Sequence, residues 1–358
     1  MALLSTILSP PPSPFDPSFL YTIFLHPLTA LLSNIHRFIL FLRGPSYRPS
    51  AAAAPTRIVC ISDTHSKIPP KTLPPGDLLI HCGDLTDVGS ILEIQRQIDW
   101  LKTLLRPDTA SPGYQHIVVI CGNHDSFFDT RSRSPNDRKA VNSDPGHPAL
   151  DWGDIHYLEH SSATLTFSFP QSSTSRTLHV FGAPQIPKCG GKDFAFQYLR
   201  GQDAWSNTIP PEVDVLVTHT PPKWHLDLGG LGDEFLLREC WRTRPTLHVF
   251  GHVHAGYGRE NMWWDGAQRA WEAVAQRGYK GGTVPEGVVG LAGAFVRELL
   301  DVRLWSLGLR MVFEDIKGLV WTRAWGGGPN RGGGWMINAA LTFRSTGVLG
   351  NDPQVVIL

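Results

Sequence analysis

The chain has 358 residues, which suggests about two domains at roughly 150 residues each, or one large domain with additions. Hydrophobic residues make up 42% and charged residues 18%, a balance that excludes a wholly disordered chain. The 32 Lys and Arg residues balance 32 Asp and Glu residues, and this zero formal net charge weighs against a dedicated nucleic-acid binder. Five cysteines, an odd number with no C-x-x-C pair, argue against a disulfide scaffold and fit a reducing compartment.

Residues 1–55 differ in composition from the rest and read as an N-terminal extension. Its apolar stretches, 19–33 and 38–42, are both shorter than the roughly 18 uninterrupted apolar residues of a spanning helix. We expect residues 19–43 either to associate with a membrane or to pack as a surface extension. Residues 50–55 (SAAAAP) read as a linker.

The arginines of this extension come after its apolar part, at Arg37, Arg43 and Arg48. A secretory signal would carry its positive charge first and a cleavage site afterwards. If the segment enters a membrane, this order keeps the following domain on the cytoplasmic side. We therefore expect a cytoplasmic protein that could be tethered by its N-terminus.

From residue 56 onward, short β-branched runs alternate with helical patterns. Five compact runs read as buried strands, at 57–62, 77–82, 116–121, 213–218 and 246–250. Helical spacing appears at 91–105 and 234–241, and strands of a second sheet are expected at 165–169 and 178–181. The alternation predicts an α/β layered core in a domain that extends from residue 56 to 358.

Two segments interrupt this pattern. Residues 126–153 are polar and proline-rich and predict a loop. Residues 262–334 predict a helical insertion with helices at 267–276 and 292–313 and a glycine-rich exit at 326–334. Strand-like segments at 335–343 and 354–358 follow the insertion.

Polar residues follow each of the five core strands at its carboxyl end. In chain order they are Asp63-Thr64-His65, Gly83-Asp84, Gly122-Asn123-His124-Asp125, His219 and Gly251-His252-Val253-His254. Ligands of open α/β layers bind outside the carboxyl ends of the strands. The ordered series therefore predicts one site, although its residues are far apart in the sequence.

These side chains match what a site for two cations requires. A carboxylate is the natural bridge between two metal ions, and Asp84 is the candidate. The other predicted ligands are Asp63, His65 and His254 for one metal, and Asn123, His219 and His252 for the other. Imidazole and oxygen donors together favour Mn, Fe or Zn over Mg or Ca. Two such cations can hold a hydroxide and two phosphate oxygens during an in-line displacement at phosphorus.

His124 is the predicted general acid, because it follows the ligand Asn123 and can face a substrate without binding metal. Asp125 has two open roles: it could orient His124, or it could cap the following turn. Lys223 and His225 could contact a substrate phosphate, or could belong to an exposed loop that packs through Trp224.

The series D-x-H, G-D, G-N-H-D, H and G-H-x-H resembles the calcineurin-like metallophosphoesterase superfamily over residues 56–257 and again from 336 to 358. Residues 182–184, 194–201, 219–222 and 248–258 and the tail 337–340 resemble the branch called metallophosphoesterase-domain-containing proteins. This resemblance implies a four-layer α/β/β/α sandwich, the two-metal site above, and phosphomonoesterase or phosphodiesterase activity. The extension and the insertion depart from the branch pattern.

The combined expectation is a metal-dependent phosphoesterase, most simply a phosphodiesterase that hydrolyses a small substrate through a metal-held hydroxide. Two alternatives stay open. One is a protein Ser/Thr phosphatase, and the other is a membrane-tethered metal-binding module with weak activity. His124 and His254 are both present, which favours an enzyme over a binding module.

Overall fold

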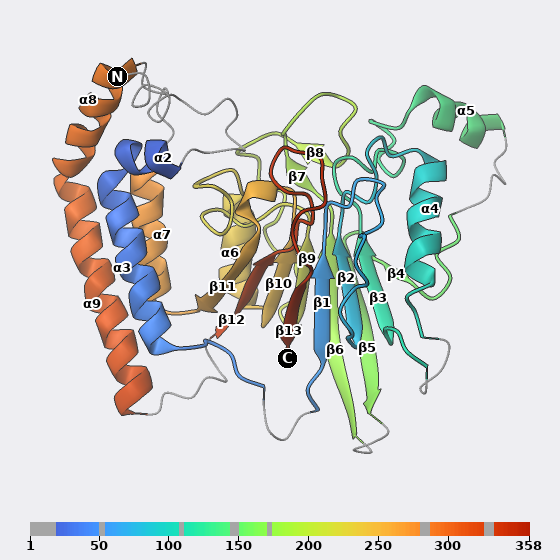
Figure 1. Cartoon of the computed structure of the whole chain (residues 1–358), viewed down its shortest axis with the longest axis horizontal. Coiled ribbons are helices and arrows are strands. Elements are labelled where there is room, and N and C mark those ends of the chain that lie inside the picture. The colour runs from blue at the N-terminus through green and yellow to red at the C-terminus, as the bar shows by residue number, and fades with distance from the viewer. Residues whose placement is uncertain are drawn as a thin grey trace. The chain divides into compact units, whose positions relative to one another are not determined.

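The chain is described here from a computed structural model (Figure 1). It covers residues 19–49, 54–106, 111–143, 150–169, 174–279, 287–325 and 333–358. Residues 50–53 of the predicted linker and 326–332 of the predicted glycine-rich exit lie outside the described residues.

The chain divides into two compact units. We call Pro49–Asp227, Gly232–Glu260 and Trp335–Leu358 the sandwich unit. We call Met1–Arg48, Leu228–Leu231 and Asn261–Gly334 the helical unit. The extension and the insertion, which lie more than two hundred positions apart in the sequence, therefore belong to the same unit.

The first sheet of the sandwich unit has five strands in the order β13-β1-β2-β3-β4. They are β13 (Gln354–Ile357), β1 (Arg57–Ile61), β2 (Leu78–Cys82), β3 (His116–Ile120) and β4 (His156–Tyr157). Strands β1 to β4 are parallel, and β13 pairs antiparallel with β1. Their β-branched residues are almost entirely buried, as expected for parallel strands that are covered on both faces.

The second sheet has six strands in the order β11-β12-β10-β9-β6-β5. They are β11 (Gly258–Trp263), β12 (Gly333–Asn338), β10 (Leu247–Phe250), β9 (Val215–Thr218), β6 (Thr174–Ala183) and β5 (Ser161–Phe169). Two short strands, β7 (Ile186–Pro187) and β8 (Gln197–Tyr198), pair with each other as a separate two-stranded sheet. Strands β12, β10, β9 and β6 are parallel, so their carboxyl ends meet at one edge.

The sheets pack face to face and each carries a helix on its outer face. Helix α4 (Ile91–Lys102) contributes Ile94, Ile98 and Leu101 to a core with alternate residues of β1, β2 and β3. Helix α6 (Glu234–Thr243) contacts the second sheet, where Cys240 Sγ lies 3.5 Å from His248 Nδ1 on β10. The expected four-layer α/β/β/α sandwich is confirmed (Figure 1).

The expectation of a loop over residues 126–153 was wrong in one part, because α5 (Pro135–Ser143) forms there. The Ser134 hydroxyl accepts a hydrogen bond from the Asp137 amide at 3.1 Å, and proline occupies the first helical position. Both features start helices, and they outweigh the polar composition of this short segment.

The helical unit contains α2 (Phe19–Leu25), α3 (Pro27–Arg43), α7 (Gly266–Gly278), α8 (Gly287–Leu299) and α9 (Val302–Ala324). Helices α3, α7 and α9 run alongside one another (Figure 1). The prediction of one helix over 292–313 was wrong, since α8 and α9 are separate. The Asp301 carboxylate accepts the amides of Arg303 and Leu304, and this N-cap begins a new helix.

Buried polar contacts join the extension to the insertion. His36 Nδ1 on α3 lies 2.9 Å from Asp315 Oδ1 on α9, and both side chains are almost fully buried. Glu298 on α8 accepts the amides of Leu28 and Thr29 at the N-terminus of α3, where a carboxylate stabilises the helix. These contacts show why polar residues interrupt the apolar stretch of the extension. Among the described residues, no helix is both long and apolar enough to cross a membrane.

Candidate metal centre

The polar residues at the strand ends converge at one edge of the sandwich unit. Three groups each place ligand atoms within 4.8 Å of one another: Asp63 with His65 and His254, His65 with Asp84 and His124, and Asp84 with His219 and His252. Asn123 joins them, because its Oδ1 lies 3.0 Å from His219 Nε2. Asp63, His65, Asp84, Asn123 and His124 follow strands of the first sheet, and His219, His252 and His254 follow strands of the second. The carboxylate of Asp84 lies where two of the groups meet.

Several of these residues turn the chain sharply after a strand. Asp63, His65, Asp84 and His252 have φ between 47° and 64°, in the left-handed region. A non-glycine residue there costs of order 1–3 kcal/mol, so the surrounding structure must hold it in place. The turn at each strand end directs a ligand side chain into the common site, and such strain is typical of functional positions.

Two glycines leave room for the carboxylates. A Cβ on Gly122 would lie 2.3 Å from Asp84 Oδ1, and one on Gly251 would lie 2.2 Å from Asp63 Oδ2. Both distances are far shorter than van der Waals contact. The glycines that precede Asn123 and His252 in the sequence are therefore required by close approach to the site.

We expect Gly251→Ala to lower metal affinity about 10- to 100-fold, because Asp63 would have to move away from the new methyl group. The overlap should also cost about 1–3 kcal/mol of stability. Isothermal titration with Mn²⁺ and thermal unfolding measure the two effects. Gly191→Ala is the matched control, since nothing lies within 4 Å of a Cβ at that position. Equal metal affinity of the two variants would contradict this account of Gly251.

Backbone carbonyls fix the orientation of two histidine rings. His219 Nδ1 bonds the carbonyl oxygen of Cys82 at 2.8 Å, and His254 Nδ1 bonds that of Arg344 at 2.8 Å. Each Nδ1 must donate, so each Nε2 carries a lone pair when the ring is neutral. His219 Nε2 nevertheless lies 3.4 Å from Asp84 Oδ2, and His254 Nε2 lies 3.2 Å from Asp63 Oδ1. A positive charge between each ring and its carboxylate stabilises this arrangement, either as a proton on Nε2 or as a divalent cation that replaces this proton.

The electrostatics of the site agree with this geometry. Burial alone would raise the pKa of Asp63 and of Asp84, but the adjacent histidines outweigh it and hold both pKa values below the usual range. Burial would lower the pKa of His219, yet the charge of Asp84 and the hydrogen bond to it raise this pKa to about 9. Burial lowers the pKa of His252 to about 3. Two charged carboxylates beside a neutral imidazole form a donor set that fits divalent cations.

His124 lies at the partly exposed side of the site. Its amide donates to Asp84 Oδ1 at 2.8 Å, and its Nδ1 bonds the carbonyl oxygen of Asp87 at 2.7 Å. Asp125 is fully buried and accepts hydrogen bonds from Thr86, from Gly122 and from the amide of Leu85. Burial and the charge of Asp84 raise the pKa of Asp125 to about 6. These bonds tie the loop after β3 to the loop after β2, which is neither the orienting role nor the capping of the following turn that the sequence left open for Asp125.

Sequence reasoning missed three residues that position the site. Asp87 holds His124 through its carbonyl, and its carboxylate lies 3.3 Å from His65 Nδ1. The Phe194 ring lies 4.8 Å from the His124 ring, and Arg344 contributes its carbonyl to His254. Asp87 could have been found from its place in the loop that carries Asp84. Arg344 acts through its backbone, which no residue type in the sequence can signal.

The sequence left the role of residues 223–225 open, and the structure shows which contacts they make. His225 is buried, and its Nδ1 lies 3.0 Å from Glu260 Oε2. Lys223 Nζ lies 5.1 Å from the centre of the Trp224 ring and 3.5 Å from Glu234. These contacts favour a packed loop over a substrate contact.

A two-sheet sandwich with histidines and carboxylates gathered at its strand ends defines a metal-binding class of protein. Residues 56–256 match the family described as "Calcineurin-like phosphoesterase". That is more than half of the chain, and the protein belongs to this family. The family resemblance seen in the sequence is confirmed.

Similar proteins come from several organisms. The chain is 43% identical to "Probable rhamnogalacturonate lyase C" of Emericella nidulans over 61% of this chain and 19% of that protein. It is 34% identical to human "Metallophosphoesterase domain-containing protein 1" over 57% of this chain and 62% of that protein. A UPF0046 protein of Caenorhabditis elegans is 32% identical over 56% of this chain and 70% of that protein. The chain thus spans less than two thirds of the length of the first two relatives.

Proposed function

We propose that this protein is a hydrolase of phosphate esters that requires two divalent cations. The observation that carries the proposal is the pair of imidazole Nε2 atoms held against buried carboxylates, where a divalent cation would replace the proton. His219 and His254 both show this arrangement. Membership of the calcineurin-like phosphoesterase family supports the same function.

The proposed ligand sets follow the grouping of the side chains. Asp63, His65 and His254 would hold one cation. Asn123, His219 and His252 would hold the other, and the carboxylate of Asp84 would contact both. Donors of mixed nitrogen and oxygen type favour Mn, Fe or Zn.

When bound, the two cations would supply Lewis-acid stabilisation of the phosphoryl oxygens and a strongly activated water. The chain itself would supply the remaining chemistry through His124. The Asp87 carbonyl fixes the Nδ1 side of this ring, and Phe194 packs against it. A ring held in this way can donate a proton to the leaving oxygen of a substrate at the open side of the site.

We further propose that the substrate is a small phosphodiester. The zero net charge of the chain supports a small ester over a long polyanion. A general acid such as His124 is most useful for an alkoxide leaving group, which alkyl esters such as cyclic nucleotides supply.

The test is a substrate panel with full-length protein that has been stripped of metal and then reloaded with Mn²⁺, Zn²⁺ or Mg²⁺. The panel compares bis-p-nitrophenyl phosphate, p-nitrophenyl phosphate, 2′,3′- and 3′,5′-cyclic nucleotides and a phosphoserine peptide. We expect turnover only after metal is restored, with diesters preferred. Preference for the phosphopeptide would indicate a protein phosphatase. Metal binding without turnover of any ester would overturn the proposal and indicate a binding module.

A further inference from the structure

We propose that the helical unit docks on an anionic lipid surface through α9, which would lie in the plane of the membrane interface. The sequence places membrane association at residues 19–43. We place the main contact on the insertion, with α3 packed beside it.

Helix α9 carries a continuous exposed apolar stripe. Its members recur at intervals of three and four residues and are Val302, Trp305, Leu309, Phe313, Ile316 and Val320. Successive helical residues turn by about 100°, so all six lie within about 80° of one another and extend over about 27 Å. Leu309 is 71% exposed and Phe313 is 66% exposed. We call this set the α9 stripe.

The buried face of α9 is a different one. Leu304, Gly308, Met311 and Asp315 are buried and pack within the helical unit. A Cβ on Gly308 would lie 2.7 Å from the Leu32 side chain, which shows how closely α3 approaches this face. The α9 stripe is therefore not needed to hold α9 against its neighbours. Exposed apolar stripes of this size mark interaction surfaces.

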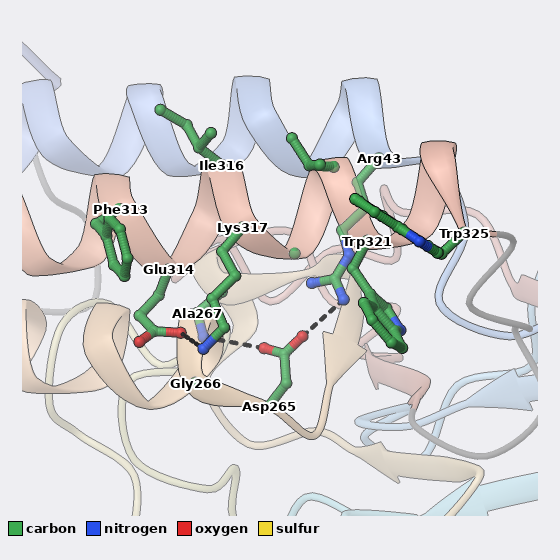
Figure 2. Close-up of a pocket in the computed structure, with 12 residues that line it drawn as sticks. Arg43, Asp265, Gly266, Ala267, Phe313, Glu314, Ile316, Lys317, Trp321 and Trp325 are labelled. Atoms are coloured by element: carbon green, nitrogen blue, oxygen red, sulfur yellow. Dashed lines mark hydrogen bonds and ion pairs between the residues drawn. The ribbon is translucent and has the colours of Figure 1, made fainter.

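A pocket next to the stripe enlarges the apolar surface. It has a volume of about 580 Å³, and Phe313, Ile316 and Val320 of the stripe also line it. Figure 2 shows the Arg43–Asp265 ion pair, 2.7 Å long, within this pocket, and Trp321 and Trp325 beside it. Both tryptophans are exposed near the C-terminal end of α9. Tryptophan is enriched where a membrane meets water, because its ring is apolar and its indole N–H is polar.

The basic residues beside the α9 stripe indicate that the surface it binds is an anionic bilayer. Arg303, Arg310 and Lys317 are exposed and follow one another at intervals of seven residues. They therefore form a basic row along one side of the α9 stripe. A helix with an apolar face bordered by basic residues is typical of segments that lie in the interface of an anionic membrane. The cytoplasmic leaflet carries such lipids, so the proposal agrees with a cytoplasmic protein.

The experiment is sedimentation of the full-length protein with vesicles of phosphatidylcholine, with and without phosphatidylserine. We expect binding to the anionic vesicles and its loss in Leu309→Glu/Phe313→Glu. Leu92→Glu is the matched control, because Leu92 is an exposed leucine on α4 in the sandwich unit. Replacing Arg303, Arg310 and Lys317 by glutamine should weaken anionic binding about 10- to 100-fold.

A second measurement covers the case in which the glutamate variant misfolds. An environment-sensitive dye is attached to the thiol introduced by Leu309→Cys or by Leu92→Cys. With anionic vesicles, the fluorescence emission should shift to the blue for Leu309→Cys and should not shift for Leu92→Cys. Failure of the wild-type protein to sediment with anionic vesicles would overturn the proposal. Lipid-independent self-association that Leu309→Glu/Phe313→Glu abolishes would also overturn it, because the stripe would then bind a second copy of the chain.

Discussion

Asp84→Asn should reduce turnover by more than about 100-fold, beyond the usual effect of altering a group that only supports a metal ligand. Asp84 is the carboxylate on which two of the ligand groups converge. Its Oδ2 lies 3.4 Å from His219 Nε2 and 3.9 Å from His65 Nε2. An asparagine there keeps one oxygen but loses the charge that the two proposed cations would share.

The substitution is also conservative for the backbone. Asp84 has φ 52°, and asparagine tolerates this left-handed conformation as aspartate does. A folded variant that has lost metal is therefore the expected result. Elemental analysis of the purified variant and steady-state kinetics with saturating Mn²⁺ measure it.

Asp99→Asn is the matched control, since Asp99 is 60% exposed on α4 and the chemical change is the same. It should keep full activity and metal content. Near wild-type turnover of Asp84→Asn, with two equivalents of metal retained, would contradict a shared carboxylate at this position.

The core of the fold could be predicted because its strands are short, apolar and fully covered. The run at 57–62 became β1, and the runs at 77–82 and 116–121 became β2 and β3, each within one or two residues. The polar residues after the strands of one sheet lie at one edge because neighbouring parallel strands end at the same edge. Strand direction therefore predicted which residues share an edge within a sheet, whereas the meeting of the two sheets' edges required the fold.

The helical unit could not be predicted from the same kind of pattern. The described residues of its two halves, within Met1–Arg48 and Asn261–Gly334, carry apolar side chains, but the sequence of neither half indicates that the other is its partner. One of the contacts that join them is a buried pair between His36 and Asp315, which lie more than two hundred residues apart. A lone histidine in an apolar stretch does not reveal which distant carboxylate it will meet.

Parts of the site also depend on contacts that residue types cannot encode. The carbonyl oxygens of Cys82, Asp87 and Arg344 hold three histidine rings, and any residue could provide them. The hydrogen bonds that the Asp125 carboxylate accepts likewise come from the amides of Leu85 and Gly122. Sequence reasoning can therefore find ligand candidates, whereas the protonation and orientation of each ring require the fold.

His124→Ala should lower turnover of alkyl phosphodiesters by about 10²–10⁴-fold, the usual contribution of a general acid. A 2′,3′-cyclic nucleotide loses an alkoxide that needs a proton, whereas bis-p-nitrophenyl phosphate loses a stable phenolate. The loss should therefore be much smaller for the aryl ester. Comparing kcat for the two substrates at saturating Mn²⁺ measures this difference.

Metal content separates the acid role from a ligand role, which matters because a ring nitrogen of His124 lies within 4.8 Å of ligand atoms on His65 and Asp84. A proton donor can be removed without loss of metal, since the predicted ligand sets do not include it. His179→Ala, which removes an exposed histidine from β6, should change neither kcat nor metal content. Loss of metal from His124→Ala, together with equal losses for aryl and alkyl esters, would show that His124 is a ligand. The structure favours the acid, because the Asp87 carbonyl binds Nδ1 and Phe194 supports the ring at the partly exposed side of the site.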